Sequence, residues 1–126
     1  APDLAMSVAS LAPSVKEINP LKLRKFKNIF YEIWNMGLKG DIFQSMKLNG
    51  ILVADILGYD LSKFNNSIRK NAIAYGISGN GPSTFIVVKK GEEGYFLDML
   101  KDRNVIVTEA VDLDCERLPV SYKRYC

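Results

Sequence analysis

The residues best suited to contact a ligand lie in one short run, YGISGNGPSTF, at residues 75–85. Its three glycines remove side-chain bulk and allow positive φ angles, so backbone N–H groups can approach a bound object such as a phosphate. Ser78 and Ser83 add hydroxyl donors, whereas Pro82 has no N–H and fixes the turn. The run is not a P-loop, because no Gly-Lys-Ser/Thr follows it. It is also not a dinucleotide-binding fingerprint, because the segment that follows is predicted to be a strand and not a helix. A hairpin loop that binds nothing remains the alternative.

Other catalytic chemistry is restricted by the composition. The chain contains no histidine, so a Ser-His-Asp or Cys-His mechanism is excluded within it. Its two cysteines, Cys115 and Cys126, show neither a disulfide framework nor metal-ligand spacing. Any catalysis within this chain would therefore have to use carboxylates, lysines, hydroxyls or backbone groups, and the sequence predicts no metal site.

Asn49 is a second candidate for ligand contact. It falls on the apolar stripe of a predicted helix, where a polar side chain must find a partner. Two interpretations stay open: a structural hydrogen bond to a neighbouring backbone group, or contact with substrate hydroxyls.

Periodicity and turn residues predict the elements that position these groups. Asn19 and Pro20 are typical of a helix start, and Gly58 is typical of a helix end. The expected order is a strand at 3–10, helices at 20–37, 41–58 and 61–72 (the last capped by Asp60), strands at 74–77 and 84–88, a helix at 91–100, a strand at 105–107 and an irregular tail at 112–126. This order predicts an α+β fold, a ferredoxin-like antiparallel sheet backed by helices, in a single domain spanning residues 1–126.

Charge and hydropathy limit the partners. A net charge of +3 is too small to indicate nucleic-acid binding, and no apolar run is long enough to span a membrane. No Lys or Arg precedes the apolar residues 4–12, as a secretory segment would require. We expect a cytoplasmic protein.

Two motifs resemble a known family. GISGNGPSTF, at residues 76–85, resembles the third motif of GHMP kinases, and MKLNGILVADILGYD, at residues 46–60, resembles a helix and turn of archaeal shikimate kinases. The resemblance covers residues 3–110. It departs at Asn80, where the family has Thr, Ala or Ser, and the family's Pro-x-x-x-Gly-Leu-Gly/Ser-Ser-Ser loop is missing.

The resemblance implies a GHMP kinase C-terminal domain with shikimate as the favoured substrate, converted to shikimate 3-phosphate in aromatic amino-acid biosynthesis. The resemblance implies that ATP and Mg²⁺ are bound mainly by an N-terminal kinase domain that this chain lacks. The catalytic carboxylate of the family belongs to that domain as well, so no catalytic residue is expected in this chain, and the isolated chain is expected to be inactive. Because Ala1 is an unusual start for a complete kinase, we expect a fragment or one part of a split enzyme. The residues implied to face phosphate and substrate are Gly76, Ser78, Gly79, Asn80, Gly81, Pro82 and Ser83.

Two rival functions remain. The substrate could instead be that of a homoserine or mevalonate-type kinase. Alternatively, the chain could be a non-catalytic ferredoxin-like binding module.

Overall fold

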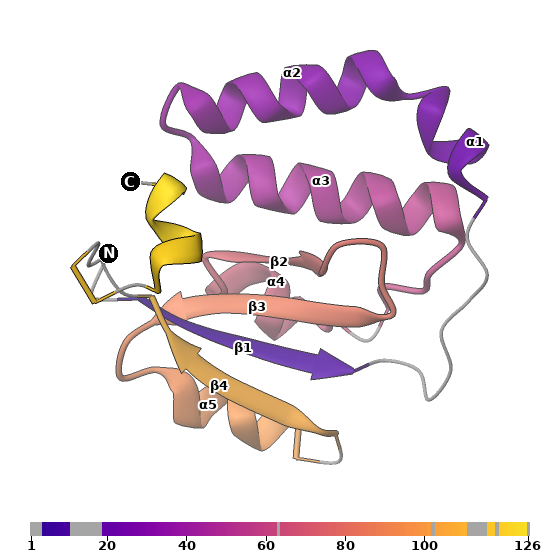
Figure 1. Ribbon diagram of the computed structural model, residues 1–126. Helices are drawn as coiled ribbons and strands as arrows, with labels where there is room; N and C mark the ends of the chain where they lie inside the picture. Colours follow the sequence, from indigo (N-terminus) through magenta and orange to yellow (C-terminus); the bar gives the residue numbers. More distant parts are fainter. Residues whose placement is uncertain are drawn as a thin grey trace.

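The computed structural model describes residues 4–10, 19–62, 64–101, 103–110, 116–117 and 119–125, with the elements labelled in Figure 1. The elements are β1 (Leu4–Ser10), α1 (Pro20–Arg24), α2 (Lys27–Leu38), α3 (Ile42–Leu57), α4 (Asn66–Asn71), β2 (Ala74–Ile77), β3 (Ser83–Lys89), α5 (Glu93–Met99), β4 (Val105–Glu109) and a 3₁₀ helix, η1 (Val120–Tyr125). No helix in the described ranges is both long enough and apolar enough to cross a bilayer.

The strands form one four-stranded sheet in the order β2-β3-β1-β4. All three neighbouring pairs are antiparallel; β1 pairs with β3 from Leu4↔Lys89 to Ser10↔Ser83 and with β4 from Ala5↔Glu109 to Ala9↔Val105. The expected α+β class and antiparallel sheet are therefore confirmed.

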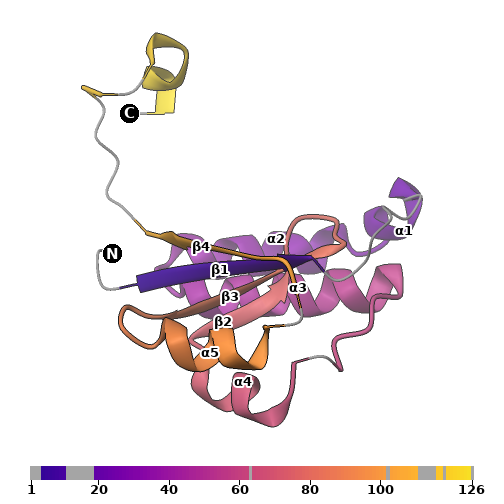
Figure 2. The ribbon, with the colours of Figure 1, turned by 90° about the horizontal axis from the view of Figure 1, so that it is seen from below.

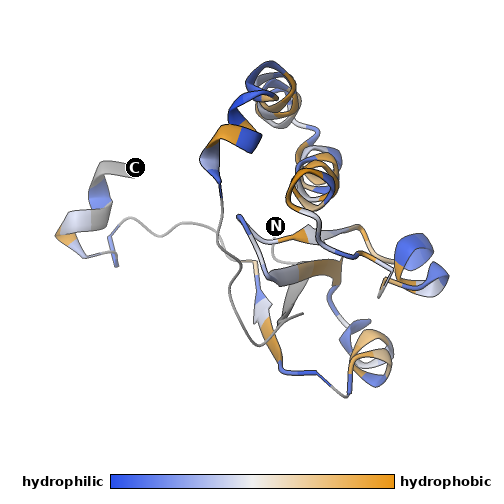
Figure 3. Ribbon diagram, turned by 90° about the vertical axis from the view of Figure 1, so that its right-hand side faces the viewer, coloured by the Kyte–Doolittle hydropathy of each residue, from blue (hydrophilic) through white to orange (hydrophobic). Residues whose placement is uncertain are grey.

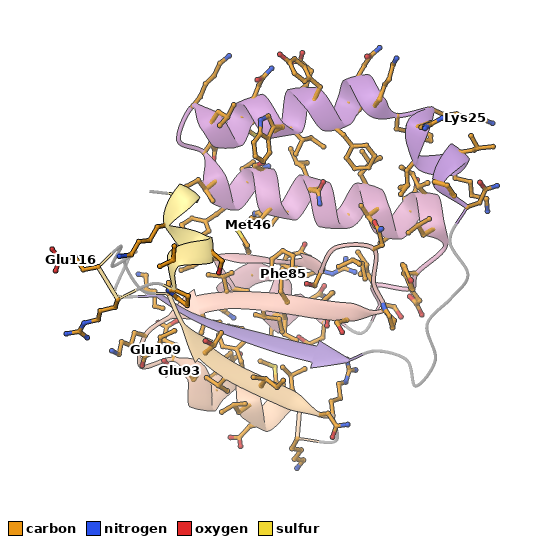
Figure 4. The ribbon with its side chains drawn as sticks, in the orientation of Figure 1. Lys25, Met46, Phe85, Glu93, Glu109 and Glu116 are labelled. Atoms are coloured by element: carbon orange, nitrogen blue, oxygen red, sulfur yellow. The ribbon has the colours of Figure 1, made fainter. Side chains whose placement is uncertain are left out.

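Helices lie on both sides of this sheet. α3 packs on one face, with α2 packed on α3 as an outer layer (Figure 1), and α4 and α5 cover the other face (Figure 2). The side chains of β3 alternate between the two layers. Phe85 and Val87 pack with Ala74 of β2 and with Phe43 and Met46 of α3. Figure 4 shows Met46 and Phe85 between that helix and the sheet.

The other face of β3 contributes Ile86 and Val88 to a second cluster. Its other buried members come from α4, α5 and the residues beside them: Phe64, Ile68, Phe96 and Leu100. Burial on both faces explains why TFIVV is apolar at successive positions instead of alternating with polar residues.

The helix predicted at 20–37 is two helices. Asn19 caps α1 as expected, its side-chain oxygen accepting the Leu21 N–H at 3.0 Å. The helix is then interrupted by a turn at residues 25–26, and α2 starts at Lys27. Ile33 is buried, but Ile29 and Trp34 are 50% and 64% exposed although both lie on the predicted apolar face. The apolar face of α2 is therefore wider than the part of it that packs against α3.

The helix after Gly58 is also shorter than predicted. Gly58 ends α3 in the left-handed conformation, with φ 75°, as expected. However, Asp60 does not cap a helix; its carboxylate accepts the Ser62 N–H at 2.8 Å and the Ser62 hydroxyl at 2.9 Å. The cap of α4 is Asn65, which accepts the Ile68 N–H at 2.9 Å.

The last part of the sheet follows the prediction closely. α5 lies inside the predicted helix, and β4 runs two residues beyond the predicted strand, to Glu109. Both oxygens of Glu93 (Figure 4) accept the Gly91 N–H, at 2.8 and 3.0 Å, and this bond holds the pKa of the Glu93 carboxyl below its usual value. Within the predicted irregular tail the structure shows η1, while residues 112–115, 118 and 126 lie outside the described residues.

Candidate functional site

The glycine-rich run forms the connection between β2 and β3. The Ser78 N–H donates to the Ser83 carbonyl at 2.8 Å, and the Gly81 N–H donates to the Ser78 carbonyl at 3.0 Å. Gly79 and Gly81 have φ angles of 58° and 78°, which side-chain-bearing residues adopt rarely. The predicted need for glycine is confirmed at these two positions.

Ser78, Gly79 and Asn80 form the exposed tip of the loop, whereas Pro82 is buried. The N–H groups of Gly79 and Asn80 donate to no acceptor among the described residues. Successive N–H groups in a turn of this kind can form an anion-binding concavity. The tip therefore offers two consecutive donors to a ligand.

Gly76 and Ser83, which the resemblance implied to face the ligand, lie within the hairpin strands. Ser83 begins β3, where its carbonyl closes the loop. Gly76 is buried in β2 beneath α3; a Cβ built on it would lie 3.0 Å from the Gly50 Cα. Gly76 therefore permits close packing of helix on strand.

Tyr59 is a residue of this site that the sequence reasoning did not identify. Its hydroxyl donates to the Asn80 carbonyl at 2.9 Å. Its ring lies against Gly81, where a Cβ would come within 2.5 Å of the ring Cζ atom. The only sequence signal is its place in LGYD, directly after the glycine that ends α3.

Asn49 lies elsewhere, on the side of α3 that faces α2. It is half-buried, and its side chain makes no hydrogen bond with the rest of the described chain. It lines an open hollow of about 490 Å³ together with residues of both helices: Trp34, Gly37, Leu38, Ile42, Ser45 and Met46. The hollow contains no residue of the glycine-rich loop. The part of the chain that the structure describes holds no group of three acidic, cysteine or histidine side chains able to bind a metal.

Comparison with known proteins gives distant relatives, among them two archaeal shikimate kinases. The chain is 29% identical over 89 residues to a shikimate kinase of Methanobrevibacter smithii and 28% identical over 83 residues to a shikimate kinase of Pyrococcus abyssi. Each match covers 66% of this chain and 29% of the relative, so the chain spans less than a third of the length of these curated proteins. No family model matches the sequence, and no solved structure matches it. The similarity links the chain to a class of phosphotransferases, and the named relatives are shikimate kinases.

Proposed function

We propose that this chain is the C-terminal domain of a GHMP kinase that phosphorylates shikimate to shikimate 3-phosphate in the cytoplasm. The observation that carries the proposal is the similarity to two archaeal shikimate kinases. The order of elements, β1, helices, β2, β3, α5, β4, supports it because this is the order of a split βαβ, ferredoxin-like fold.

The role proposed for the chain is to position phosphate. Phosphoryl transfer depends mainly on positioning and on neutralising charge, and backbone N–H groups can contribute to both. The N–H groups of Gly79 and Asn80, which donate to no acceptor in the part of the chain that the structure describes, are the donors we assign to a phosphate oxygen. When bound, ATP supplies the transferred phosphoryl group and Mg²⁺ neutralises its charge.

We assign the metal to the N-terminal domain, as the resemblance of residues 46–60 and 76–85 to GHMP kinases implies. The share of the relatives that the chain leaves unmatched is large enough for such a domain. Asn49 remains a proposed substrate contact. Its half-buried amide borders an apolar hollow, as the polar groups of small-molecule sites often do.

An ADP-release assay tests this function. We expect the 126-residue chain alone to show no turnover, and a complex with its N-terminal domain to turn over shikimate in preference to homoserine or mevalonate. Turnover by the chain alone would reveal an ATP site within it. A folded complex that phosphorylates none of the three alcohols would favour the non-catalytic binding module.

A further inference from the structure

The loop between β2 and β3 is held from outside the hairpin by a residue that follows α3. Gly58 turns the chain at the end of α3, and the Tyr59 N–H donates back to the Ala54 carbonyl at 2.9 Å. The ring of Tyr59 then packs against the buried cluster of Val53, Ala54 and Ile77. Its hydroxyl is thereby placed at the loop, 21 residues further along the sequence.

The Asn80–Gly81 peptide is anchored at both of its polar ends. Its carbonyl accepts the Tyr59 hydroxyl at 2.9 Å, and its N–H donates to the Ser78 carbonyl at 3.0 Å. Rotation of this peptide unit would break both hydrogen bonds. The neighbouring N–H groups of Gly79 and Asn80 remain without acceptors among the described residues.

Rotation would also matter electrostatically. A free Asn80 carbonyl could turn its negative end toward an anion bound at the loop tip, where it would oppose the two neighbouring N–H donors. A loop whose dipoles are fixed in advance stabilises an anion better, because binding does not have to order it.

We propose that Tyr59 is a positioning residue, whose hydroxyl fixes the Asn80–Gly81 peptide so that the Gly79 and Asn80 N–H groups can hold a phosphate. The inference rests on the proposed function, because it assumes that the loop binds phosphate. Tyr59 itself touches the loop and is assigned no contact with the ligand.

The test titrates inorganic pyrophosphate into the ¹⁵N-labelled 126-residue chain and follows the Gly79 and Asn80 amide resonances. Tyr59→Phe keeps the ring against Gly81 and removes only the hydroxyl. We expect it to stay folded and to bind pyrophosphate about two- to tenfold more weakly, a change no larger than the net contribution of one hydrogen bond.

Tyr75→Phe is the matched control. Tyr75 is also half-buried and also adjoins the loop region, in β2, but its ring packs against Phe64 and its hydroxyl bonds to nothing among the described residues. We expect this variant to bind pyrophosphate as the wild type does.

The outcomes separate the two proposals. If the wild type binds and Tyr59→Phe binds equally well, the positioning role is wrong while the phosphate-facing loop stands. If pyrophosphate leaves the Gly79 and Asn80 resonances of the wild type unmoved, the phosphate-facing loop is itself wrong, and the role of Tyr59 falls with it. Equal weakening in Tyr59→Phe and Tyr75→Phe would overturn the specific role of the Tyr59 hydroxyl.

Discussion

At the scale of single residues, the two loop glycines serve different purposes. Both have positive φ angles, so any side chain would strain the backbone at either position. Around Gly79 there is open space, with nothing within 4 Å of a built Cβ. Around Gly81 the Tyr59 ring fills that space, with ring atoms at 2.5 and 2.7 Å. Gly79 therefore leaves room for a ligand, whereas Gly81 leaves room for the chain's own tyrosine.

Substitution by alanine separates these roles. We expect Gly79→Ala to cost about 1–2 kcal/mol, the price of a left-handed conformation for a residue with a Cβ. Gly81→Ala carries the same strain and must also displace the Tyr59 ring, so we expect a larger loss of unfolding free energy and a break in the bond to Asn80. Urea denaturation of both variants measures the difference. Equal losses would show that Tyr59 moves aside without cost.

At the scale of elements, α3 and β2 approach each other through a pair of glycines. A Cβ on Gly50 would lie 2.8 Å from the Gly76 Cα and 2.9 Å from the Ile77 nitrogen. Both contacts are with backbone atoms, which cannot rotate away as a side chain can. The approach brings α3 down onto the strand that leads into the loop.

Gly50→Ala is expected to push α3 away from β2. Although alanine favours helices, the forced shift should lower the unfolding free energy by about 1–3 kcal/mol, as overpacking of a core does. Gly94→Ala in α5 is the control, because a Cβ there meets nothing within 4 Å and φ is not positive. We expect that control to be stabilised by about 0.5–1 kcal/mol. Thermal or urea melts of the two variants should move in opposite directions, and a stable Gly50→Ala would contradict the tight packing.

The elements that local signals define were predicted well, and those that depend on tertiary contacts were not. The TFIVV strand and the helix end at Gly58 follow from residue types alone. The interruption between α1 and α2 falls at Lys25 and Phe26. Neither residue type breaks helices, so the helical spacing of the apolar residues predicted one continuous helix.

The start of α4 could not be chosen from sequence for a similar reason. Asp60 and Asn65 are equally good capping residues. The distinction lies in contacts such as that of Arg69, whose Nε donates to the Phe64 carbonyl at 2.8 Å and holds the turn before the helix. Within the site, the glycine-rich loop was predictable from its composition. Tyr59 was not, because its hydrogen bond joins residues 21 positions apart.

At the scale of the whole molecule, α2 carries an apolar stripe that the rest of the described chain leaves largely exposed. Tyr31, Trp34 and Leu38, at i, i+3 and i+7, are 63%, 64% and 67% exposed, and Ile42 at the start of α3 continues the stripe at 55%. Figure 3 shows α2 nearly end-on, as the helix farthest from the sheet, with hydrophobic and hydrophilic residues around it. The stripe borders the hollow between α2 and α3. A contiguous apolar surface of this kind is typical of an interaction site.

We expect this stripe to contact the N-terminal domain that the proposed function requires. Each relative has 71% of its length outside the match (100 minus 29), which is long enough for a further domain. Trp34 is the only tryptophan of the chain and reports directly on the surface. With ¹⁵N-labelled chain and unlabelled N-terminal domain, the indole N–H resonance of Trp34 should shift on mixing.

Leu38→Lys should weaken the complex about tenfold or more, as loss of an apolar anchor does at other interfaces. Tyr95→Lys on α5 is the matched control, since Tyr95 is 52% exposed on the opposite face of the sheet and should leave binding unchanged. A complex that forms without moving the Trp34 resonance would place the domain elsewhere. Sedimentation of the chain alone as a dimer that Leu38→Lys dissociates would show that the stripe binds a second copy instead.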